Sequence, residues 1–419
     1  MKINVKAEVA ERYENVGTIE TLPGSGASFR YAESWKNRKP ALPLSLSLPL
    51  SADLYPERAL RPYFEGLLPE EQARRIISRE LGIPSTRYLK LLGALGQECI
   101  GAVLLEPEED VSCALDQPRY SPLAPEMLDS LAQSERTFPE ELAAESRLSL
   151  AGAQSKTGLY YAEDGSWWIP LGTAPSNVIV KPGNSRFPRI VDNELFCLNL
   201  AKQCGVPAPS AWKVGAERSM LAVTRYDRIP SPTGRAIDGH AGLCRLHQED
   251  FCQAMGLSGQ RKYEDQKQHY LARMADMLRR HSTNPLADVP RLFELQLFNY
   301  LIGNCDAHAK NCSVLRSPDW SSLSLAPVYD LVSTAVYPEL SRNMGLYTGG
   351  NRKLDNIGRD DFLDLAEECR IARRAAERSI DAMRERLADA LVSMSIECEV
   401  EQQIAQQAQR GIRQLAATH

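Results

Sequence analysis

The pattern of apolar and polar residues predicts a small region of mixed α+β structure at the start of the chain. Lys2–Lys6 and Leu44–Leu48 place apolar side chains at every second position, which is the period of a strand with one buried face. Apolar residues at helical spacing then predict helices near Pro69–Leu81 and Thr86–Leu95. Ile100–Leu105 is short and apolar, as expected for a further strand.

In the remainder of the chain, strand signals come first and helical signals follow. Strands are predicted for four apolar segments: Gly158–Tyr161, Trp167–Pro170, Asn177–Lys181 and Met220–Thr224. From Gln248 onward the helical period dominates, with a buried helix at Arg291–Ile302 and a long amphipathic helical region at Glu367–Ser395. Between these two, Ser313–Leu315 and Leu323–Leu325 predict two short strands.

Composition excludes several classes of protein. At 419 residues the chain is long enough for two or three domains with cores of their own. Lys and Arg total 49 and Asp and Glu total 54, so no basic field favours nucleic-acid binding over the whole molecule.

No stretch approaches the roughly 20 apolar residues that cross a bilayer, and the start lacks the apolar region of a signal peptide. We therefore expect a cytoplasmic protein without membrane contact.

The cysteines indicate neither a zinc site nor a disulfide framework. The 10 cysteines are scattered and form no Cys-x-x-Cys pair. Cys197, Cys252 and Cys305 lie in apolar or helical stretches, so we expect buried thiols there.

A polar cluster directly after the helix predicted at Arg291–Ile302 carries a chemical signal. Gly303 ends the helix, Asp306 is followed five residues later by Asn311, and Asp330 comes after the two short strands. Phosphotransferases use this spacing to place one base and two metal ligands around the phosphates of ATP. Asp306 would accept a proton from a substrate hydroxyl, and the oxygens of Asn311 and Asp330 suit Mg²⁺. A surface turn with an Asx cap has the same spacing, so the spacing alone leaves both interpretations open.

The chemistry and the order of elements together predict the fold class. We expect an α+β protein with a bilobal protein-kinase-like fold, in which a strand-rich N-lobe precedes a helical C-lobe. A small α+β subdomain in residues 1–106 would come first, followed by a connecting segment rich in Pro, Glu, Asp and Ser in 107–146. The N-lobe would occupy 147–226 and the C-lobe 227–419.

A loop of small residues could contact the phosphates of ATP, because small side chains let backbone N–H groups approach closely. Its residues are Ala151, Gly152, Ala153, Gln154, Ser155 and Lys156. It is not a Walker A loop, since Leu150 stands where the first glycine is needed and Ser155 replaces the second. An ordinary hairpin of small residues fits this segment equally well.

Three further segments could complete an ATP site. Lys181 ends a predicted strand, like the lysine that pairs with the α- and β-phosphates, although strand-end lysines also commonly reach into solvent. A helix follows, with Asp192 as N-cap and Gly205 as the residue after its C-terminus. Glu194 could pair with Lys181 or act as a helix-dipole carboxylate. The adenine hinge, or a simple strand-to-loop exit, would consist of Thr224, Arg225 and Tyr226.

Together these segments resemble the HipA family of bacterial toxin kinases. The matching segments, in chain order within residues 148–333, are LSLAGAQSKTGL, VIVKPG, VDNELFCLNLAKQCGVPAP, LAVTRYDR, RLHQEDFCQAMGL, LFNYLIGNCDAHAKNCSVL and LAPVYDLVS. The stretch from FEGLLPEE to LLGALGQECIGAVLLEPE resembles the small N-terminal domain of that family.

The resemblance implies a serine/threonine protein kinase that uses ATP and Mg²⁺. Asp306 would be the catalytic base, and Asn311 and Asp330 would be the magnesium ligands. The ATP site would further include Lys181, the loop from Ala151 to Lys156, the hinge, His308, Lys310 and Tyr329. Ser149 matches the serine that such kinases autophosphorylate to inactivate themselves, because a phosphate there would repel the triphosphate. The sequence departs from the family at Ser155, where Glu is frequent, and from typical protein kinases at His308, where Lys is usual.

The resemblance also implies partners. Family members act with a small helix-turn-helix antitoxin, here expected to be HipB-like, and contact operator DNA mainly through it. The protein substrate would be a translation component such as an aminoacyl-tRNA synthetase. Asn351–Lys353 is a basic turn where family members can contact DNA, but its residues alone favour an ordinary solvated turn. Two alternatives remain at this stage: a small-molecule kinase of the aminoglycoside or choline type, and a non-catalytic, kinase-shaped co-repressor.

Overall fold

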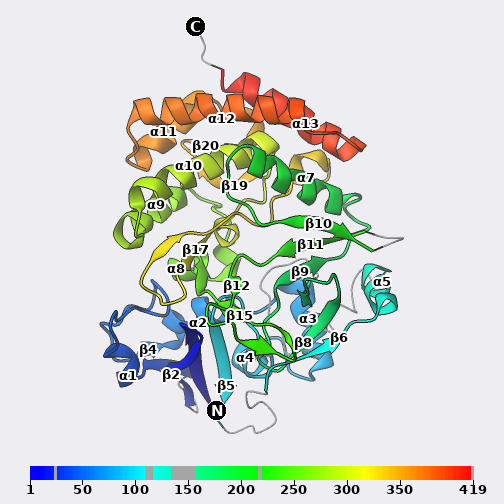
Figure 1. Ribbon diagram of the computed structural model, residues 1–419. Helices are drawn as coiled ribbons and strands as arrows, with labels where there is room; N and C mark the ends of the chain where they lie inside the picture. Colours follow the sequence, from blue (N-terminus) through cyan, green and yellow to red (C-terminus); the bar gives the residue numbers. More distant parts are fainter. Residues whose placement is uncertain (23–25, 109–116, 134–155, 216–218, 417–419) are drawn as a thin grey trace. The chain divides into compact units, whose positions relative to one another are not determined.

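The computed structural model describes residues 1–22, 26–108, 117–133, 156–215 and 219–416 (Figure 1). The chain divides into two compact units, and each is considered by itself. Unit 1 contains Met1–Gly183, Val214–Gly259 and Leu315–Ser322. Unit 2 contains Asn184–Lys213, Gln260–Val314 and the residues from Leu323 onward. Among the described helices, none is long and apolar enough to span a bilayer.

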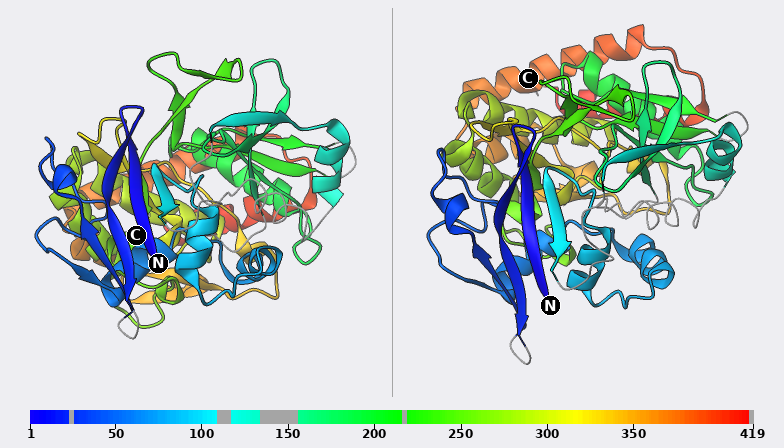
Figure 2. Two further views of the ribbon diagram at one scale, coloured as in Figure 1. Left: turned by 90° about the horizontal axis from the view of Figure 1, so that it is seen from below. Right: turned by 60° about the horizontal axis from the view of Figure 1, so that its bottom comes forward.

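An antiparallel sheet with the strand order β4-β3-β2-β1-β5 forms the first part of unit 1. Its strands are β1 (Lys2–Val9), β2 (Arg12–Leu22), β3 (Gly26–Tyr31), β4 (Tyr55–Pro56) and β5 (Val103–Pro107). Figure 2 shows β1 and β2 (dark blue) as a long twisted hairpin, with β5 (cyan) alongside. The strands predicted at Lys2–Lys6 and Ile100–Leu105 are confirmed, the second with its start shifted to Val103.

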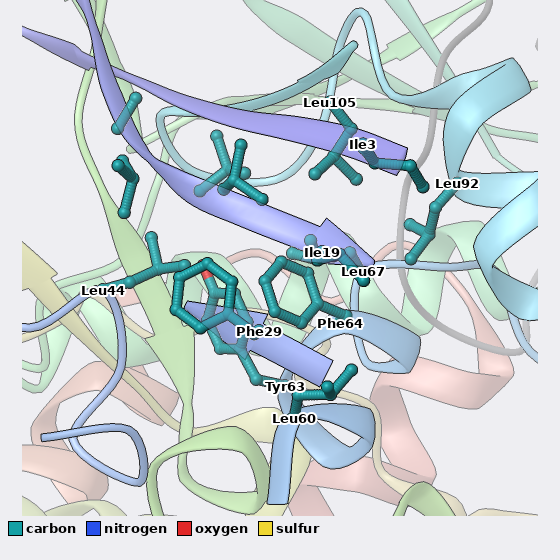
Figure 3. Packing of buried hydrophobic residues seen from close by; sticks show 14 of the residues in the cluster. Ile3, Ile19, Phe29, Leu44, Leu60, Tyr63, Phe64, Leu67, Leu92 and Leu105 are labelled. Atoms are coloured by element: carbon teal, nitrogen blue, oxygen red, sulfur yellow. The ribbon is translucent and has the colours of Figure 1, made fainter. Parts of the chain in front are cut away.

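Helices pack against this sheet and close its hydrophobic core. Ile3 and Phe29 from the strands and Phe64 from α2 are fully buried and lie together (Figure 3). The helices of this region are α1 (Glu33–Lys36), α2 (Glu57–Glu65), α3 (Glu71–Glu80) and α4 (Tyr88–Leu95). Helix α2 contacts β3 and α4 contacts β5. The two helices predicted from apolar periodicity are confirmed as α3 and α4.

The strand predicted at Leu44–Leu48 is wrong, because this segment forms turns. The hydroxyl of Tyr31 donates to the Leu48 carbonyl at 2.6 Å and accepts from the Leu44 N–H at 2.9 Å. One buried side chain thus supplies the hydrogen bonds that a neighbouring strand would otherwise supply. Leu44, Ser45 and Leu48 are buried, whereas Leu46 is only half-buried. The alternation of apolar residues in the sequence therefore matches neither a strand nor a strand-like alternation of burial.

A second antiparallel sheet of unit 1 has the order β11-β9-β7-β8-β6. Its strands are β6 (Arg119–Pro122), β7 (Thr157–Tyr161), β8 (Trp167–Leu171), β9 (Val178–Lys181) and β11 (Met220–Thr224). The four strands predicted for this region are confirmed, and Lys181 is the last residue of β9. β6 and α5 (Pro125–Gln133) lie within residues 107–146, so part of that segment adds an edge strand to this sheet.

Shorter elements complete unit 1. β12 (Arg228–Pro230) pairs with β15 (Leu243–Arg245), and β13 (Ala236–Ile237) pairs with β14 (His240–Ala241). β16 (Gln248–Asp250) leads into α8 (Phe251–Ala254), where Asp250 and Gln253 form a capping box. β10 (Ala211–Val214) precedes β11 in the chain and spans the division between the units.

Unit 2 is mainly helical. Its helices are α7 (Ile190–Gln203), α9 (Tyr270–His281), α10 (Pro285–Ile302), α11 (Arg359–Glu368), α12 (Arg373–Ser393) and α13 (Glu399–Gln414). Helix α10 contacts α9, α12 and α13, and Figure 1 shows α12 and α13 (orange to red) extending over it. The predicted short strands are confirmed as β17 (Ser313–Arg316) and β18 (Leu323–Leu325), and a hairpin of β19 (Asn343–Thr348) and β20 (Asn351–Lys353) follows.

Two helix boundaries differ from the predicted ones. The helical region at Glu367–Ser395 is divided between α11 and α12, because Arg370 between them has a left-handed backbone with φ 50°. Helix α7 begins at Ile190, so Asp192 lies in its first turn and is not the N-cap. The predicted end is confirmed, since Gly205 follows α7 with φ 73° in the left-handed region that glycine favours.

A buried group of charged side chains joins the two larger sheets of unit 1. Glu98, between α4 and β5, accepts hydrogen bonds from Arg225 at 3.1 Å, Arg228 at 3.0 Å and Arg245 at 2.6 Å. Each of these side chains is at most 1% exposed. Asp227 pairs with Arg225 and Arg228, each at 2.8 Å. Burial alone would raise the pKa of Glu98, but the three guanidinium groups together lower it to about 2.

Replacing Glu98 should therefore be strongly destabilising. Glu98→Gln leaves three buried guanidinium groups with less negative charge, which should lower the free energy of unfolding by about 3–5 kcal/mol. Because the pKa of Glu98 is about 2 in the fold against an ordinary 4.5, its stabilisation is fully present above pH 4.5 and declines as the pH falls towards 2. Urea unfolding at a series of acidic pH values should show this loss in the wild type and a weaker one in the variant.

The matched control is Glu108→Gln. Glu108 pairs with Lys2 at 2.7 Å but is 49% exposed, so this change should leave stability almost unaltered. Equal unfolding free energies for Glu98→Gln and the wild type would contradict the assigned role of the buried group.

Candidate active site

The segment that follows α10 is fixed by the way the helix ends. Gly303 has φ 71°, and its N–H donates to the Tyr300 carbonyl at 3.1 Å, while the Asn304 N–H donates to the Asn299 carbonyl at 2.8 Å. This pair of bonds is the Schellman motif, which needs a left-handed residue at the turn. The buried Asn304 side chain donates to Asn299 Oδ1 at 3.0 Å and accepts from the Asp306 N–H at 3.2 Å. The chain is thereby turned so that the Asp306 side chain is exposed.

A second segment, downstream of Asp330, holds the same loop. The Cys305 N–H donates to Thr334 Oγ1 at 2.8 Å, and Thr334 Oγ1 lies 3.3 Å from the Gly303 carbonyl. The Ala335 N–H donates to that carbonyl as well, at 3.0 Å. Burial raises the pKa of the Cys305 thiol, so this cysteine is not a thiolate nucleophile at neutral pH.

Asp306 and Asn311 are in direct contact. Asn311 Nδ2 donates to the Asp306 backbone carbonyl at 3.0 Å, and the Asn311 N–H donates to the His308 carbonyl at 2.9 Å within η3 (Ala309–Asn311). The amide nitrogen of Asn311 is thus committed to the loop. Its amide oxygen is the remaining polar atom of the side chain, and such an oxygen is a ligand that Mg²⁺ accepts.

One hydrogen bond joins the segment of Asn311 to the segment of Asp330. The Tyr329 hydroxyl donates to the Lys310 carbonyl at 2.7 Å and lies 2.5 Å from Ser313 Oγ. Lys310 precedes Asn311 and Tyr329 precedes Asp330, so the two predicted metal ligands are held through adjacent residues. Asp330 itself has φ 52°, a left-handed conformation that is uncommon outside glycine and concentrates at functional sites.

Helix α7 supports the chain that follows Asp330. Asn193 Nδ2 donates to the Ser333 carbonyl at 3.0 Å, and the Ser333 N–H donates back to Asn193 Oδ1 at 2.8 Å. Both residues are fully buried. A side-chain amide thus pairs with one peptide unit as a neighbouring strand would, which fixes the segment from Asp330 to Ser333.

The remaining predicted site residues fall into three groups. His308 and Lys310 are buried in unit 2, at 6% and 8% exposure, in the same loop as Asp306. Ser149 and the segment 151–155 lie outside the described residues. The others belong to unit 1, and they are Lys156, Lys181, Thr224, Arg225 and Tyr226.

The hinge segment of unit 1 uses its side chains for internal contacts. The Arg225 guanidinium lies in the buried charged group around Glu98, and the Arg225 N–H donates to the Asn177 carbonyl at 2.8 Å. The Tyr226 hydroxyl donates to Gln248 Oε1. Lys181 is buried at 4% exposure. Glu194, its predicted partner, belongs to unit 2, so their pairing stays a prediction.

Several residues around Asp306 were not indicated by the sequence pattern. Tyr263 donates its hydroxyl hydrogen bond to Asp306 Oδ1. Gly345 of β19 lies so close to the loop that a Cβ atom there would be 2.4 Å from the Ala307 carbonyl oxygen. An isolated glycine within a strand can mark a close backbone approach, so Gly345 carried a usable signal. Tyr263 carried none, because it lies in an irregular segment.

Unit 2 contains another group of possible metal ligands, in which one carboxylate is already paired with cationic side chains. Ligand atoms of Asp192, Cys398 and Glu401 lie within 4.8 Å of one another. Asp192 pairs with Lys213, and with Arg189 at 3.3 Å. Protein cations therefore balance this carboxylate, and the group gives no ground for assigning a metal there.

Comparison with known proteins gives consistent matches over most of the chain. The model of the HipA-like C-terminal domain matches residues 148–391, and that of the HipA N-terminal domain matches residues 7–106. The protein Y4mE of Sinorhizobium fredii is 36% identical over 368 residues, which cover 87% of this chain and 85% of Y4mE. The serine/threonine-protein kinase toxin HipA of Shewanella oneidensis is 28% identical over 328 residues, covering 75% of this chain and 72% of that protein.

A solved structure matches the fold. HipA of Shewanella oneidensis MR-1, in a complex with HipB and operator DNA, superposes with a TM-score of 0.79 at 23% identity. The match covers 99% of this chain and 97% of that chain. It confirms the predicted α+β fold of the kinase-like kind.

The close approach of Gly345 to the Asp306 loop predicts a sensitive position. Gly345→Ala would place a methyl group against the Ala307 carbonyl and the His308 nitrogen, and backbone atoms cannot yield as a flexible side chain can. We expect the free energy of unfolding to fall by about 1–3 kcal/mol, the usual cost of overpacking. Amide exchange at Ala307 and His308 should become faster.

Gly350→Ala is the matched control, since it lies in the same hairpin and a Cβ there meets nothing within 4 Å. Chemical denaturation and hydrogen exchange of both variants test the prediction. Similar results for Gly345→Ala and Gly350→Ala would show that β19 does not restrain the loop.

Proposed function

The chain belongs to the HipA family, and on this premise we propose that it is an ATP-dependent serine/threonine protein kinase that acts as the toxin of a toxin–antitoxin module. The relative from Shewanella oneidensis is named a kinase toxin, which supports this function. The protein substrate would be a component of translation such as an aminoacyl-tRNA synthetase.

The observation that carries the proposal is the arrangement around Asp306. Its carboxylate is exposed on a loop fixed at both ends, and Asn311 contacts its backbone. The hydrogen bond between Tyr329 and Lys310 couples the segments of Asn311 and Asp330. One exposed carboxylate beside two oxygen ligands is what phosphoryl transfer from ATP requires of a protein.

Each residue has a defined part in the proposed reaction. Asn311 and Asp330 would hold Mg²⁺, and Lys181 would pair with the phosphates of ATP. When bound, Mg²⁺ neutralises charge on the phosphates. Asp306 takes the proton of a substrate hydroxyl, whose oxygen forms a bond to the γ-phosphorus while the bond to the bridging β–γ oxygen breaks. The products are a phosphorylated hydroxyl and ADP.

The proposal extends to regulation and partners. Ser149 would be an autophosphorylation site that switches the kinase off, since a dianionic group near the triphosphate weakens nucleotide binding. The partner would be a HipB-like helix-turn-helix antitoxin, through which the complex reaches operator DNA. The support is the fold shared with a HipA that is seen with HipB and operator DNA.

The role of Asp306 can be tested by removing its charge. Asp306→Asn should bind ATP with little change, because it is neither a phosphate nor a metal ligand in the proposal. It should transfer phosphate about 10²–10⁴-fold more slowly, the usual contribution of a general base. The measurement is transfer from radiolabelled ATP to the protein itself, with phosphate mapped by mass spectrometry to Ser149.

Asp364→Asn is a matched control, since Asp364 is exposed on α11 and has no part in the proposed site. It should transfer phosphate at the wild-type rate. If Asp306→Asn transfers as fast as this control, Asp306 is not the base.

The toxin role predicts an effect in cells. Expression without an antitoxin should arrest growth, and Asp330→Asn should relieve the arrest because a neutral amide holds Mg²⁺ more weakly. Asn is the preferred replacement, since it tolerates the left-handed backbone at this position and so preserves the fold. Growth is measured at equal protein levels, and arrest by both proteins would indicate a non-catalytic toxicity.

A further inference from the structure

The side chain of Tyr263 contacts the carboxylate to which we assign the base. The Tyr263 hydroxyl donates a hydrogen bond to Asp306 Oδ1. Tyr263 is half-buried, and Asp306 is exposed. Tyr263 lies in the irregular segment between η2 (Gly259–Arg261) and α9, far from Asp306 in the sequence. The contact between this hydroxyl and the carboxylate is therefore a tertiary one, made by the fold and not by neighbouring residues in the sequence.

The backbone on each side of Tyr263 is anchored. The Lys262 carbonyl accepts from the Ala309 N–H at 3.1 Å, and the Glu264 N–H donates to the Gly345 carbonyl at 2.9 Å. The first bond joins the segment to the loop that carries Asp306, and the second joins it to β19. Tyr263 is consequently held in place by its own main chain and is not carried on a free loop.

The side chain of Glu264 strengthens this anchor. It is only 1% exposed, and its Oε1 accepts from the N–H groups of Gln268 at 2.6 Å and Tyr270 at 3.2 Å. Its Oε2 accepts from the Tyr347 N–H at 3.0 Å. A buried carboxylate that takes three backbone donors fixes the turn that leads into α9.

The ring of Tyr263 is packed as well. It meets the His308 ring edge-on, with centroids 4.9 Å apart and planes at 84°. Lys262 Nζ lies 5.5 Å from the ring centroid. His308 belongs to the same loop as Asp306, so the ring and the hydroxyl of Tyr263 both contact that loop.

We propose that Tyr263 is a positioning residue for the base, which holds one carboxylate oxygen of Asp306 so that the other is presented to the substrate hydroxyl. This inference rests on the proposed function. The last torsion of an aspartate side chain has a broad energy minimum, so a donor that fixes one oxygen narrows the orientation of the other. A rigid donor that fixes one oxygen keeps the second in a reactive orientation. The conformational entropy of the carboxylate is then lost on folding and does not add to the activation barrier.

The geometry separates this role from that of a blocking group. A tyrosine that occupied the place of the substrate hydroxyl would have to leave for the reaction to proceed. The anchors at Lys262 and Glu264 and the contact with His308 oppose that movement. The two roles predict opposite effects of deleting the hydroxyl.

The test is the variant Tyr263→Phe, which keeps the ring against His308 and removes only the hydroxyl. We expect kcat for phosphate transfer to fall about tenfold or more, the effect of losing one hydrogen bond to a charged group. The Kd for Mg-ATP, the KM for ATP and the melting temperature should stay at wild-type values. Tyr270→Phe is the matched control: it removes a hydroxyl that donates to the Arg261 carbonyl at 3.2 Å in the same segment and should keep the wild-type kcat.

A double variant distinguishes positioning from a structural effect. If Tyr263 acts through Asp306, adding Tyr263→Phe to Asp306→Asn should not slow transfer further, because the two changes remove one function. A further drop in the double variant, an unchanged kcat in Tyr263→Phe, or an increased kcat would each overturn the inference. If the wild type transfers no phosphate from ATP, the proposed function fails and this inference fails with it.

Discussion

The hydrogen bond from the Tyr329 hydroxyl to the Lys310 carbonyl is the constraint on which the candidate site depends. It joins segments 19 residues apart, and the residues next to its two ends are the proposed metal ligands Asn311 and Asp330. It acts directly beside the two ligands, and Asp330 has a left-handed backbone that needs support from outside its own segment. The Asn193–Ser333 pair and the Thr334 contacts extend the same support along the chain.

The structure of unit 1 depends on the buried ion pairs around Glu98. Glu98 stands between the N-terminal sheet and the second sheet, and Glu8 of β1 adds a contact to Arg245 at 3.1 Å. Desolvation makes such charges costly, and they persist where every partner is present. Charged groups of defined geometry permit fewer arrangements than an apolar interface, so they fix how the two sheets meet. Residues 1–106 belong to unit 1 together with the second sheet.

Much of this could be predicted from the sequence, for identifiable reasons. The strands Val178–Lys181 and Met220–Thr224 and the helix Pro285–Ile302 carry long, regular apolar patterns, and the Asp306–Asn311–Asp330 spacing marked the loop that the structure holds together. The strand prediction for Leu44–Leu48 was wrong because the hydroxyl of Tyr31, which is distant in the sequence, makes hydrogen bonds to the backbone of this segment. Tyr263 could not be predicted, since a contact across 43 residues leaves no local signature.

The reciprocal pair of Asn193 and Ser333 has a consequence for synthesis of the chain. Helix α7 is complete at Gln203, but the peptide group that satisfies its buried amide is translated 140 residues after Asn193. Closing so long a loop is slow, and it waits for the later segment to leave the ribosome. A nascent chain therefore cannot fix the segment that follows Asp330 before Ser333 has left the ribosome, however early helix α7 has formed.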